Sequence, residues 1–390
     1  MVDTLVSGAS ASRRVGSTPI SGTREFSFCW TLFLYILHVF PGRPWQIPTF
    51  IAVSATLLPD NRGGCLQFCY IYENVQVNTA VSMKIVFLDA ATMGNVSFEP
   101  FERLGEFVRY ESSTPEQARE RVKDIDVLLI NKVLVNKELI DAAPNLKLIC
   151  IAATGVNNID VEYAASKGIP VRNAVGYSTD SVVQSTYMHI LSLVGGGQYF
   201  DESVKSGSYS RSGMFTDPNW NWWELAGKTI GIIGLGNIGK KVAHIAEAFG
   251  MKVCYFSTSG TGHCHDYPCL PLEQLLAQSD IVSIHAPLNE RTNRLIGAKE
   301  LAMMKPTAYL VNMGRGAIVV EEDLADAVDK GVIAGAGIDV FVTEPIPEDH
   351  PYLKMNHPER MRLAPHVAWA SMEARQRLVG IMADNIAKGW

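Results

Sequence analysis

The sequence predicts an α/β fold made of two doubly wound parallel-sheet domains, and three observations lead to this prediction. From Lys84 onward, short apolar runs rich in β-branched residues alternate with helical patterns. The alternation resumes at Thr229, where an apolar run enters a Gly-x-Gly-x-x-Gly turn and a helical pattern leaves it. The chain has 390 residues, 47% of them hydrophobic, which is enough for two or three domains with their own cores.

Charge and cysteine usage exclude some classes of function. The formal net charge is −6, which gives no electrostatic reason to expect nucleic-acid binding. The 7 cysteines are scattered and odd in number, which argues for reduced thiols in a reducing compartment. We therefore expect a cytoplasmic protein that has no nucleic-acid partner.

Residues 1–82 differ from the rest, and we expect this extension to lie outside the main fold. Arg13, Arg14 and Arg24 precede an apolar run over residues 26–40, which is shorter than the ~20 residues that a membrane helix needs. A signal peptide, an organellar transit peptide and a membrane anchor remain alternatives to a dispensable extension or a mis-assigned start. Met83 directly precedes the first clear strand, so the working protein could begin there, and we expect no membrane association.

The first domain is predicted to contain five strands, at residues 84–88, 107–110, 127–131, 146–153 and 169–173. A helix between them begins with Thr114 as its N-cap, Pro115 at the first helical position and Gln117 at the third, which is a capping-box pattern. Such alternation implies a parallel sheet with helices on both faces.

Two loops of this domain follow strands and are candidates for binding a substrate. Asn131 and Lys132 follow the third strand, and Gly155 and Val156 follow the fourth. In open α/β sheets, ligands bind beyond the carboxyl ends of the strands. The backbone N–H groups around Gly155 and Val156 could hold a carboxylate, although a simple turn explains the same residues.

A helix over residues 181–194 is predicted to leave the first domain and to end at the three glycines of 195–197. The stretch from there to Glu224 is predicted to be irregular and contains Trp220, Trp222 and Trp223. Clustered tryptophans are costly to expose, so we expect an interface, most simply that of a homodimer. The alternative is that they pack back onto the same subunit.

The glycine turn predicts dinucleotide binding. Gly234 makes the tight turn, Gly236 lets the backbone approach a pyrophosphate, and Gly239 allows close packing of helix on strand. The helix that follows presents free N–H groups to the phosphates. The predicted cofactor-binding residues of this turn are Gly234, Gly236, Asn237, Ile238 and Gly239.

The end of the next strand, residues 252–256, bears on the choice of cofactor. A carboxylate is expected there to hold the adenosine ribose hydroxyls, but Ser257 and Thr258 follow instead, and no arginine stands beside them. Ser257 has no charge to repel a 2′-phosphate, and nothing in this stretch attracts one. We therefore expect NAD as the cofactor, with NADP not excluded and with weak discrimination between them.

A loop with His263, Cys264, His265 and Cys269 has the composition of a metal site but not the spacing of one. We expect a polar surface loop and no bound metal.

Four further strands, predicted within residues 281–287, 308–316, 335–340 and 361–366, each end in a turn with polar residues. Because parallel strands end at one edge of a sheet, these turns should meet at the glycine turn. They add further cofactor-binding candidates, which are Ala286, Pro287, Met313, Gly314 and Asp339.

Three ionisable residues beyond these strands suit the reduction of a 2-oxo acid. Arg315 could grip the carboxylate of the acid in bidentate fashion. His366 could donate the proton that balances hydride arrival, because a histidine titrates near neutral pH. Glu344 could orient the imidazole and favour its protonated form. We therefore predict Arg315, Glu344 and His366 to be catalytic.

These motifs together resemble the D-isomer-specific 2-hydroxyacid dehydrogenase family over nearly everything after residue 82. The matching stretches are Gly234-x-Gly-x-x-Gly239, Asn312-Met-Gly-Arg315-Gly, Gly337-Ile-Asp339-Val with Glu344-Pro345, and Ala364-Pro-His366. Residues 222–229 and 365–371 resemble the glycerate dehydrogenase (hydroxypyruvate reductase) branch.

The resemblance implies roles and a domain arrangement. It makes Arg315 the substrate-binding residue, His366 the acid/base with Glu344 as its partner, and Asp339 a neighbour of the nicotinamide. It implies a flavodoxin-like substrate domain formed by residues 83–180 and 367–390, and an inserted Rossmann domain of residues 181–366. Two departures stand out: Ser257 replaces the usual acid, and the chain stops at Trp390 where relatives often continue.

The leading hypothesis is thus an NAD(P)-dependent oxidoreductase for a small D-2-hydroxy acid or 2-oxo acid, most simply glycerate and hydroxypyruvate. The alternatives are a dehydrogenase for another 2-oxo acid and a nucleotide-sensing, corepressor-like binding protein on the same fold, since fold alone does not decide function.

Overall fold

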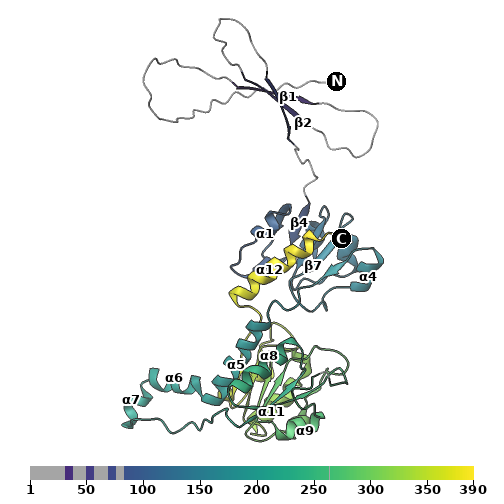
Figure 1. The fold of residues 1–390 in the computed structure, drawn as a ribbon. Helices are drawn as coiled ribbons and strands as arrows, with labels where there is room; N and C mark the ends of the chain where they lie inside the picture. The colour runs from purple at the N-terminus through teal and green to yellow at the C-terminus, as the bar shows by residue number, and fades with distance from the viewer. Residues whose placement is uncertain (1–30, 38–49, 57–68, 76–82, 263) are drawn as a thin grey trace, which may run out of the picture. The chain divides into compact units, whose positions relative to one another are not determined.

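The computed structural model describes residues 31–37, 50–56, 69–75, 83–262 and 264–390, and it divides into two compact units, Met1–Ser82 and Met83–Trp390. In the first unit the described backbone forms an antiparallel sheet in the order β1-β2-β3, drawn in purple in Figure 1. Its strands are β1 (Thr31–Leu37), β2 (Phe50–Thr56) and β3 (Cys69–Val75).

The apolar run at residues 26–40 therefore includes a strand in its centre, while its two ends and the three arginines lie outside the described residues. Within the described part of the chain, no helix has the length and apolar character needed to cross a membrane.

The second unit begins with a parallel five-stranded sheet in the order β5-β4-β6-β7-β8. β4, the first of these strands in the sequence, therefore lies inside the sheet. The strand order reverses between β4 and β6, as in flavodoxin-like domains. Its strands are β4 (Lys84–Phe87), β5 (Glu106–Arg109), β6 (Val127–Ile130), β7 (Leu148–Ile151) and β8 (Val171–Arg172).

Both faces of this sheet are buried, because alternate residues of each strand enter different cores. Ile85 and Phe87 belong to one core with η1, α1 and α12, whereas Val86 and Leu88 belong to another with α2, α3 and α4. The helices are η1 (Ala90–Met93), α1 (Glu99–Glu102), α2 (Pro115–Arg121), α3 (Lys137–Asp141), α4 (Val161–Ser166) and α12 (Met372–Ala387).

The last helix thus completes the core of the first sheet. Leu378 and Met382 of α12 are fully buried beside Phe87 and Leu148, although almost the whole chain separates them in sequence. The yellow α12 lies against β4 and β7 in Figure 1. The boundaries at residues 180/181 and 366/367 remain predictions.

The second sheet has six parallel strands in the order β10-β9-β11-β12-β13-β14. Its strands are β9 (Thr229–Ile233), β10 (Lys252–Phe256), β11 (Ile281–Ile284), β12 (Tyr309–Asn312), β13 (Gly335–Ile338) and β14 (Met361–Leu363). The order reverses between β9 and β11, which places a switch point next to the glycine turn. The predicted fold class, with two parallel-sheet α/β domains, is confirmed.

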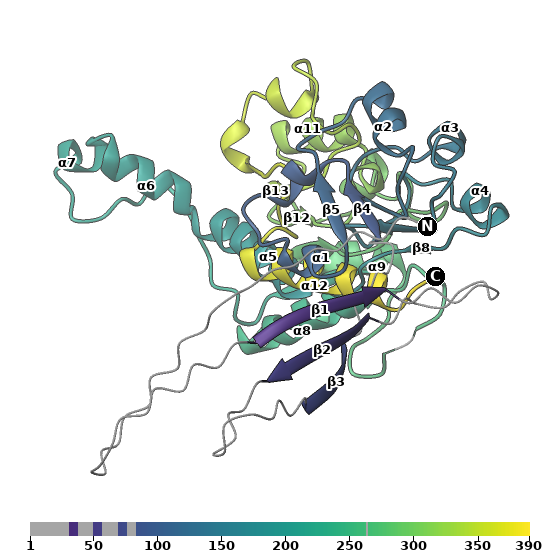
Figure 2. The same ribbon diagram turned by 90° about the horizontal axis from the view of Figure 1, so that it is seen from above.

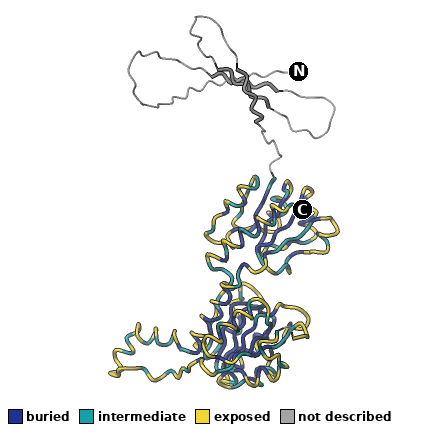
Figure 3. The backbone as a smooth tube through the Cα atoms, viewed as in Figure 1, coloured by how far each residue is buried: buried dark blue, intermediate teal, exposed yellow. Residues whose placement is uncertain are grey.

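Helices cover both faces of the second sheet, and the interior of this domain is largely dark blue, that is buried, in Figure 3. α5 and α8 share one core with Ile230 and Ile232, and α9, α10 and α11 share the other with Val282 and Ile284. The elements are α5 (Thr179–Gly195), α6 (Gly197–Lys205), α7 (Ser208–Ser212), α8 (Asn237–Ala248), α9 (Leu272–Gln278), α10 (Ala298–Leu301), η2 (Gly316–Ile318), α11 (Glu321–Asp329), η3 (Pro351–Leu353) and η4 (Pro358–Arg360).

Two local predictions can be compared with these elements. The capping box of α2 is confirmed, because the Thr114 hydroxyl accepts from the Gln117 N–H and the Gln117 side chain accepts from the Thr114 N–H. The prediction that residues 197–224 are irregular is wrong in its first half, where α6 and α7 form. Neither helix buries a residue, so the sequence has no apolar stripe from which they could be predicted. Both helices extend away from α5 in Figures 1 and 2.

The three tryptophans between α7 and β9 lie in different surroundings. The Trp223 ring stacks on Tyr309 of β12 with 6.1 Å between centroids, and Trp220 stacks on Tyr199 at 5.4 Å. These two pack back onto their own chain, as the alternative interpretation stated. Trp222 is 59% exposed.

Candidate active site

The turn between β9 and α8 shows a separate steric reason for each of its glycines. Gly234 has φ +91°, and a Cβ there would lie 2.9 Å from the Ala286 nitrogen. At Gly239 a Cβ would lie 2.4 Å from the Gly234 carbonyl oxygen, so only glycine lets α8 approach β9 this closely. At Gly236 a Cβ would meet no atom within 4 Å. That position faces open space, which a phosphate could fill.

The same turn fits a dinucleotide pyrophosphate. The N-cap of α8 is Gly236, which makes no side-chain capping hydrogen bond. The N–H groups of the first helical turn therefore lack a side-chain cap and can bind an anion. Of the other candidates in this turn, Asn237 is exposed and Ile238 is half-buried against the core around α5 and α8.

The turns after β11 and β12 lie against the glycine turn. A Cβ at Gly314 would lie 2.9 Å from the Ala286 carbonyl oxygen, and Ala286 also touches Gly234. Met313 is buried in the core, whereas Pro287 is exposed. The structure thus brings Gly234, Ala286 and Gly314 together at one edge of the sheet.

Arg315 is held in the turn after β12 by a buried asparagine. The Asn312 side chain donates to the Arg315 carbonyl oxygen at 2.9 Å and accepts from the Gly314 N–H at 3.0 Å. The Arg315 guanidinium donates to the Gly314 carbonyl oxygen at 2.8 Å. A Cβ at Gly155 would lie 2.9 Å from Arg315 Nη2, so this loop of the first sheet approaches the guanidinium closely. Two predicted carboxylate-binding positions, Arg315 and Gly155, are therefore neighbours.

His366 and Glu344 form a hydrogen-bonded pair, with 2.7 Å between His366 Nδ1 and Glu344 Oε2. The two side chains are 22% and 30% exposed, so each remains accessible from one side. Glu344 Oε1 also accepts from the Phe341 N–H at 3.0 Å. Because Nδ1 is occupied by the carboxylate, Nε2 is the ring nitrogen that can face a ligand.

The backbone of His366 is in the left-handed region, with φ +53°. A non-glycine residue there costs about 1–3 kcal/mol and needs support from its surroundings. The support comes from Asp339, whose carbonyl oxygen accepts from the His366 N–H at 2.7 Å. The Asp339 carboxylate accepts from the N–H groups of Val367 and Ala368, each at 2.9 Å.

The register of the sheet places these groups next to one another. Asn312 of β12 pairs with Ile338 of β13, which pairs with Leu363 of β14. Arg315, Asp339 and His366 each follow one of these neighbouring strands. In addition, a Cβ at Gly316 would lie 2.0 Å from the carbonyl carbon of Phe341, so the Arg315 turn packs on the segment that leads to Glu344.

The carboxyl groups of the site titrate differently. Burial raises the pKa of Glu344, but the hydrogen bonds from His366 and the Phe341 N–H and the positive charges of His366 and Lys132 outweigh it and lower the pKa below its ordinary value. Burial raises the pKa of Asp339 above its ordinary value, against the Ala368 and Val367 N–H groups and two nearby histidines. The charge of Lys132, a predicted substrate residue, thus acts on Glu344.

Asp89, which was not among the residues predicted from the sequence, holds the loop after β6 in place. It follows β4, is 6% exposed, and its carboxylate accepts from the N–H groups of Asn131, Lys132 and Val133 at 2.8, 2.5 and 3.0 Å. The sequence contained a signal for this role, because Asp89 is an acidic residue just after a buried strand. The loop after the neighbouring strand β6 lies at the same edge of the sheet, within reach of such a side chain.

The other predicted substrate residues lie in the loops after β6 and β7. Asn131 is 3% exposed, and its Nδ2 has no hydrogen-bond partner among the residues that the structure describes. The Asn158 side chain donates to the carbonyl oxygens of Asn131 and Val133, which ties the loops after β6 and β7 together. The Val156 side chain packs against the core around α2 to α4, so only its backbone is a candidate for binding.

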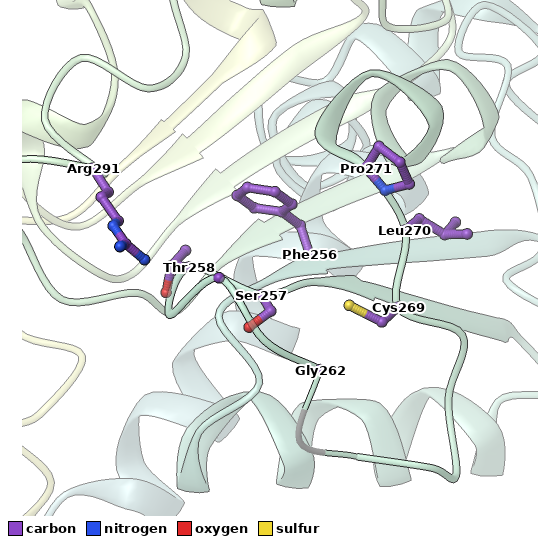
Figure 4. A pocket seen from close by; sticks show the side chains of 9 residues that line it. Phe256, Ser257, Thr258, Gly262, Cys269, Leu270, Pro271 and Arg291 are labelled. Atoms are coloured by element: carbon purple, nitrogen blue, oxygen red, sulfur yellow. The ribbon is translucent and has the colours of Figure 1, made fainter.

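Ser257 and Thr258, at the end of β10, are half-buried and line a pocket of about 320 Å³ that also includes Arg291 (Figure 4). Among the described residues, no group of three or more His, Cys, Asp or Glu could hold a metal ion. His263 of the loop considered for a metal lies outside the described residues.

Comparisons with known proteins agree with this geometry. Residues 187–368 match the family model described as "D-isomer specific 2-hydroxyacid dehydrogenase, NAD binding domain". The chain is 34% identical to a hydroxypyruvate reductase of Blautia hydrogenotrophica over 316 residues, which covers 78% of this chain and 96% of the relative. It is 36% identical to a glycerate dehydrogenase of Methylorubrum extorquens over 307 residues, with the same coverage of 78% and 96%.

A solved structure adds the fold comparison. The NADPH-dependent glyoxylate/hydroxypyruvate reductase of Sinorhizobium meliloti, in complex with NADP and malonate, superposes with a TM-score of 0.67 at 28% identity. The match covers 78% of this chain and 93% of that one.

The role of Asp89 can be tested by substitution. Asp89→Ala leaves three N–H groups of the 131–133 loop without their acceptor, so we expect the free energy of unfolding to fall by roughly 2–4 kcal/mol. Asp124→Ala is the matched control, because its carboxylate is exposed and pairs with Lys84, and we expect little change. Urea unfolding measures both. Equal stability of the two variants would contradict the assigned role.

Proposed function

Because the chain belongs to the D-isomer specific 2-hydroxyacid dehydrogenase family, we propose that it interconverts hydroxypyruvate and D-glycerate with a nicotinamide cofactor. The observation that carries the proposal is the His366–Glu344 pair at 2.7 Å, at the same sheet edge as Arg315 and the glycine turn. The activity class is that of an NAD(P)-dependent D-2-hydroxyacid dehydrogenase.

A nicotinamide cofactor held at the glycine turn by Gly234, Gly236 and the N-terminus of α8 would supply a hydride for the carbonyl carbon of the acid. Arg315 binds the carboxylate of the substrate, for which the guanidinium has the matching planar geometry. The backbone N–H groups near Gly155 and Val156 add donors, because Gly155 lies against the guanidinium. Together these contacts fix the substrate so that its carbonyl oxygen faces His366.

His366 then donates a proton from Nε2 to the carbonyl oxygen as negative charge develops there. Glu344 holds Nδ1 and stabilises the imidazolium before the transfer. In the direction of oxidation, neutral His366 accepts the hydroxyl proton at the same atom. Asp339 keeps the imidazole in place through the backbone of residues 366–368.

We propose hydroxypyruvate as the substrate, and not another 2-oxo acid, because relatives named hydroxypyruvate reductase and glycerate dehydrogenase match over 78% of the chain. Lys132, whose charge acts on Glu344, is a polar group near the site that could contact the substrate's hydroxyl. Turnover of hydroxypyruvate, glyoxylate and pyruvate with NADH and NADPH tests the proposal. A nucleotide-sensing protein would bind the cofactor and turn over none of them.

Removal of the proton donor should slow the chemical step. His366→Ala is expected to lower kcat by about 10²- to 10⁴-fold, the usual contribution of a general acid, with a smaller effect on KM because Arg315 remains. Arg315→Lys should instead raise KM strongly, since a point charge cannot replace the guanidinium fork. His244→Ala, whose side chain is 84% exposed on α8, is the control. Near-normal turnover by His366→Ala would refute the mechanism.

The carboxylate partner should set the pH range. The pKa of Glu344 is lowered, so the group is ionised wherever a histidine titrates. Glu344→Gln removes a charge that favours the imidazolium, so reduction should lose activity at a pH about one unit lower. Oxidation needs the neutral imidazole and should therefore persist to lower pH in the same variant. Profiles of kcat in both directions measure this, and two unchanged profiles would contradict the role of Glu344.

We also propose a homodimer. Exposed apolar side chains form a surface near α5 and α8, here called the α5–α8 surface, made of Met188, Leu191 and Phe249, which are 62%, 45% and 39% exposed. They line one shallow hollow with Tyr187 and Ile245. α6 and α7 bury no residue of their own, which favours contact with a second copy.

Sedimentation of the full chain should therefore show a dimer at micromolar concentration. Met188→Asp puts a charge into the α5–α8 surface and should shift the equilibrium toward monomer. Met372→Asp, at a 70% exposed methionine that begins α12, is the matched control and should stay dimeric. A wild-type chain that sediments only as a monomer would remove the proposal.

A further inference from the structure

The end of β10 lacks the group that usually selects NAD. In dinucleotide domains, a carboxylate at this place binds the ribose hydroxyls and repels a 2′-phosphate. Here Phe256 is followed by Ser257 and Thr258, and both line the pocket of Figure 4. The Ser257 hydroxyl donates to the Thr261 carbonyl oxygen and is paired with Ser259 at 3.0 Å. None of the described residues that line this pocket is acidic.

An arginine from a distant part of the sequence supplies positive charge to the same pocket. Arg291 lies in the loop after β11, and its Nη1 donates to the Ser259 carbonyl oxygen at 2.8 Å. A Cβ at Gly260 would lie only 2.9 Å from that nitrogen, so the chain at Gly260, with φ +88°, lets the guanidinium approach closely. In Figure 4 the guanidinium of Arg291 points toward Thr258.

The guanidinium retains capacity for an anion. Arginine has five N–H donors, and this one makes a single side-chain hydrogen bond with the residues that the structure describes. It forms no ion pair with any described carboxylate. A guanidinium beside a hydroxyl group, here that of Thr258, is a typical arrangement for binding a phosphate.

We propose that Arg291, together with the Thr258 hydroxyl, binds the 2′-phosphate of NADP(H), so that this protein prefers NADPH to NADH. The proposal rests on the proposed function, since it specifies which cofactor that site takes. The proposal differs from the expectation of NAD that was drawn from the sequence, where no arginine stands beside Ser257. The charge that attracts the 2′-phosphate comes from another loop.

Equilibrium binding of NADP⁺ and NAD⁺ to the full chain, measured by calorimetry, tests the proposal without any turnover. The wild type should bind NADP⁺ at least about tenfold more tightly than NAD⁺. Arg291→Ala should lose about ten- to a hundredfold in NADP⁺ affinity, as expected for a charge-assisted hydrogen bond, and less than about twofold in NAD⁺ affinity. Arg294→Ala, an exposed arginine three positions later, is the matched control and should leave both affinities unchanged.

A second variant tests the pocket from the opposite direction. Ser257→Asp restores a carboxylate at the end of β10 and should make NAD⁺ the preferred ligand. Equal affinity of the wild type for both nucleotides would overturn the proposal, and so would an equal loss of both in Arg291→Ala. Because binding is measured alone, a chain that prefers NADP⁺ but reduces no 2-oxo acid would refute the proposed function and leave this inference standing.

Discussion

The site depends on one buried carboxylate, that of Asp339. Its two oxygens accept the N–H groups of Val367 and Ala368, and its carbonyl oxygen accepts that of His366. Its own N–H donates to Asn312, the residue that organises the Arg315 turn. Burial costs a carboxylate less when its oxygens accept hydrogen bonds, and here the same bonds help to hold His366 at a positive φ. One aspartate thus fixes His366, the proposed proton donor, and is bonded to the strand that leads to Arg315.

The same segment joins the two sheets. Ser181 of α5 donates to the Ala368 carbonyl oxygen at 2.6 Å and accepts from the Ser371 N–H at the start of α12. α5 packs on the second sheet, and α12 packs on the first. Residues 366–371 therefore carry His366 at one end and begin the helix that completes the other core. A change in the relative position of the two sheets would therefore act on the backbone segment that holds His366.

Glycine acts in this protein mainly by allowing close approach. Gly239 lets α8 reach β9, Gly155 leaves room for Arg315 beside the first sheet, and Gly316 packs on the Phe341 backbone. Gly260 does the same for Arg291. In each case an atom of the site would collide with a methyl group, so a side chain would displace either a strand, a loop or a guanidinium. Gly236 differs, because it faces open space that a ligand can fill.

Features that depend on neighbouring residues could be predicted from the amino-acid sequence alone. Continuous apolar runs such as Val127–Ile130 predicted buried parallel strands, Thr114 and Gln117 predicted a capping box, and the glycine turn predicted the start of α8. It also singled out Arg315, Glu344 and His366, because each follows a recognisable strand. Which distant groups meet depends on the three-dimensional fold. Asp89 reaches the loop after β6, Trp223 returns to β12, and Arg291 reaches Ser259, through contacts that no local pattern encodes. The reason is that strand order, and not sequence distance, sets which loops share an edge of a parallel sheet.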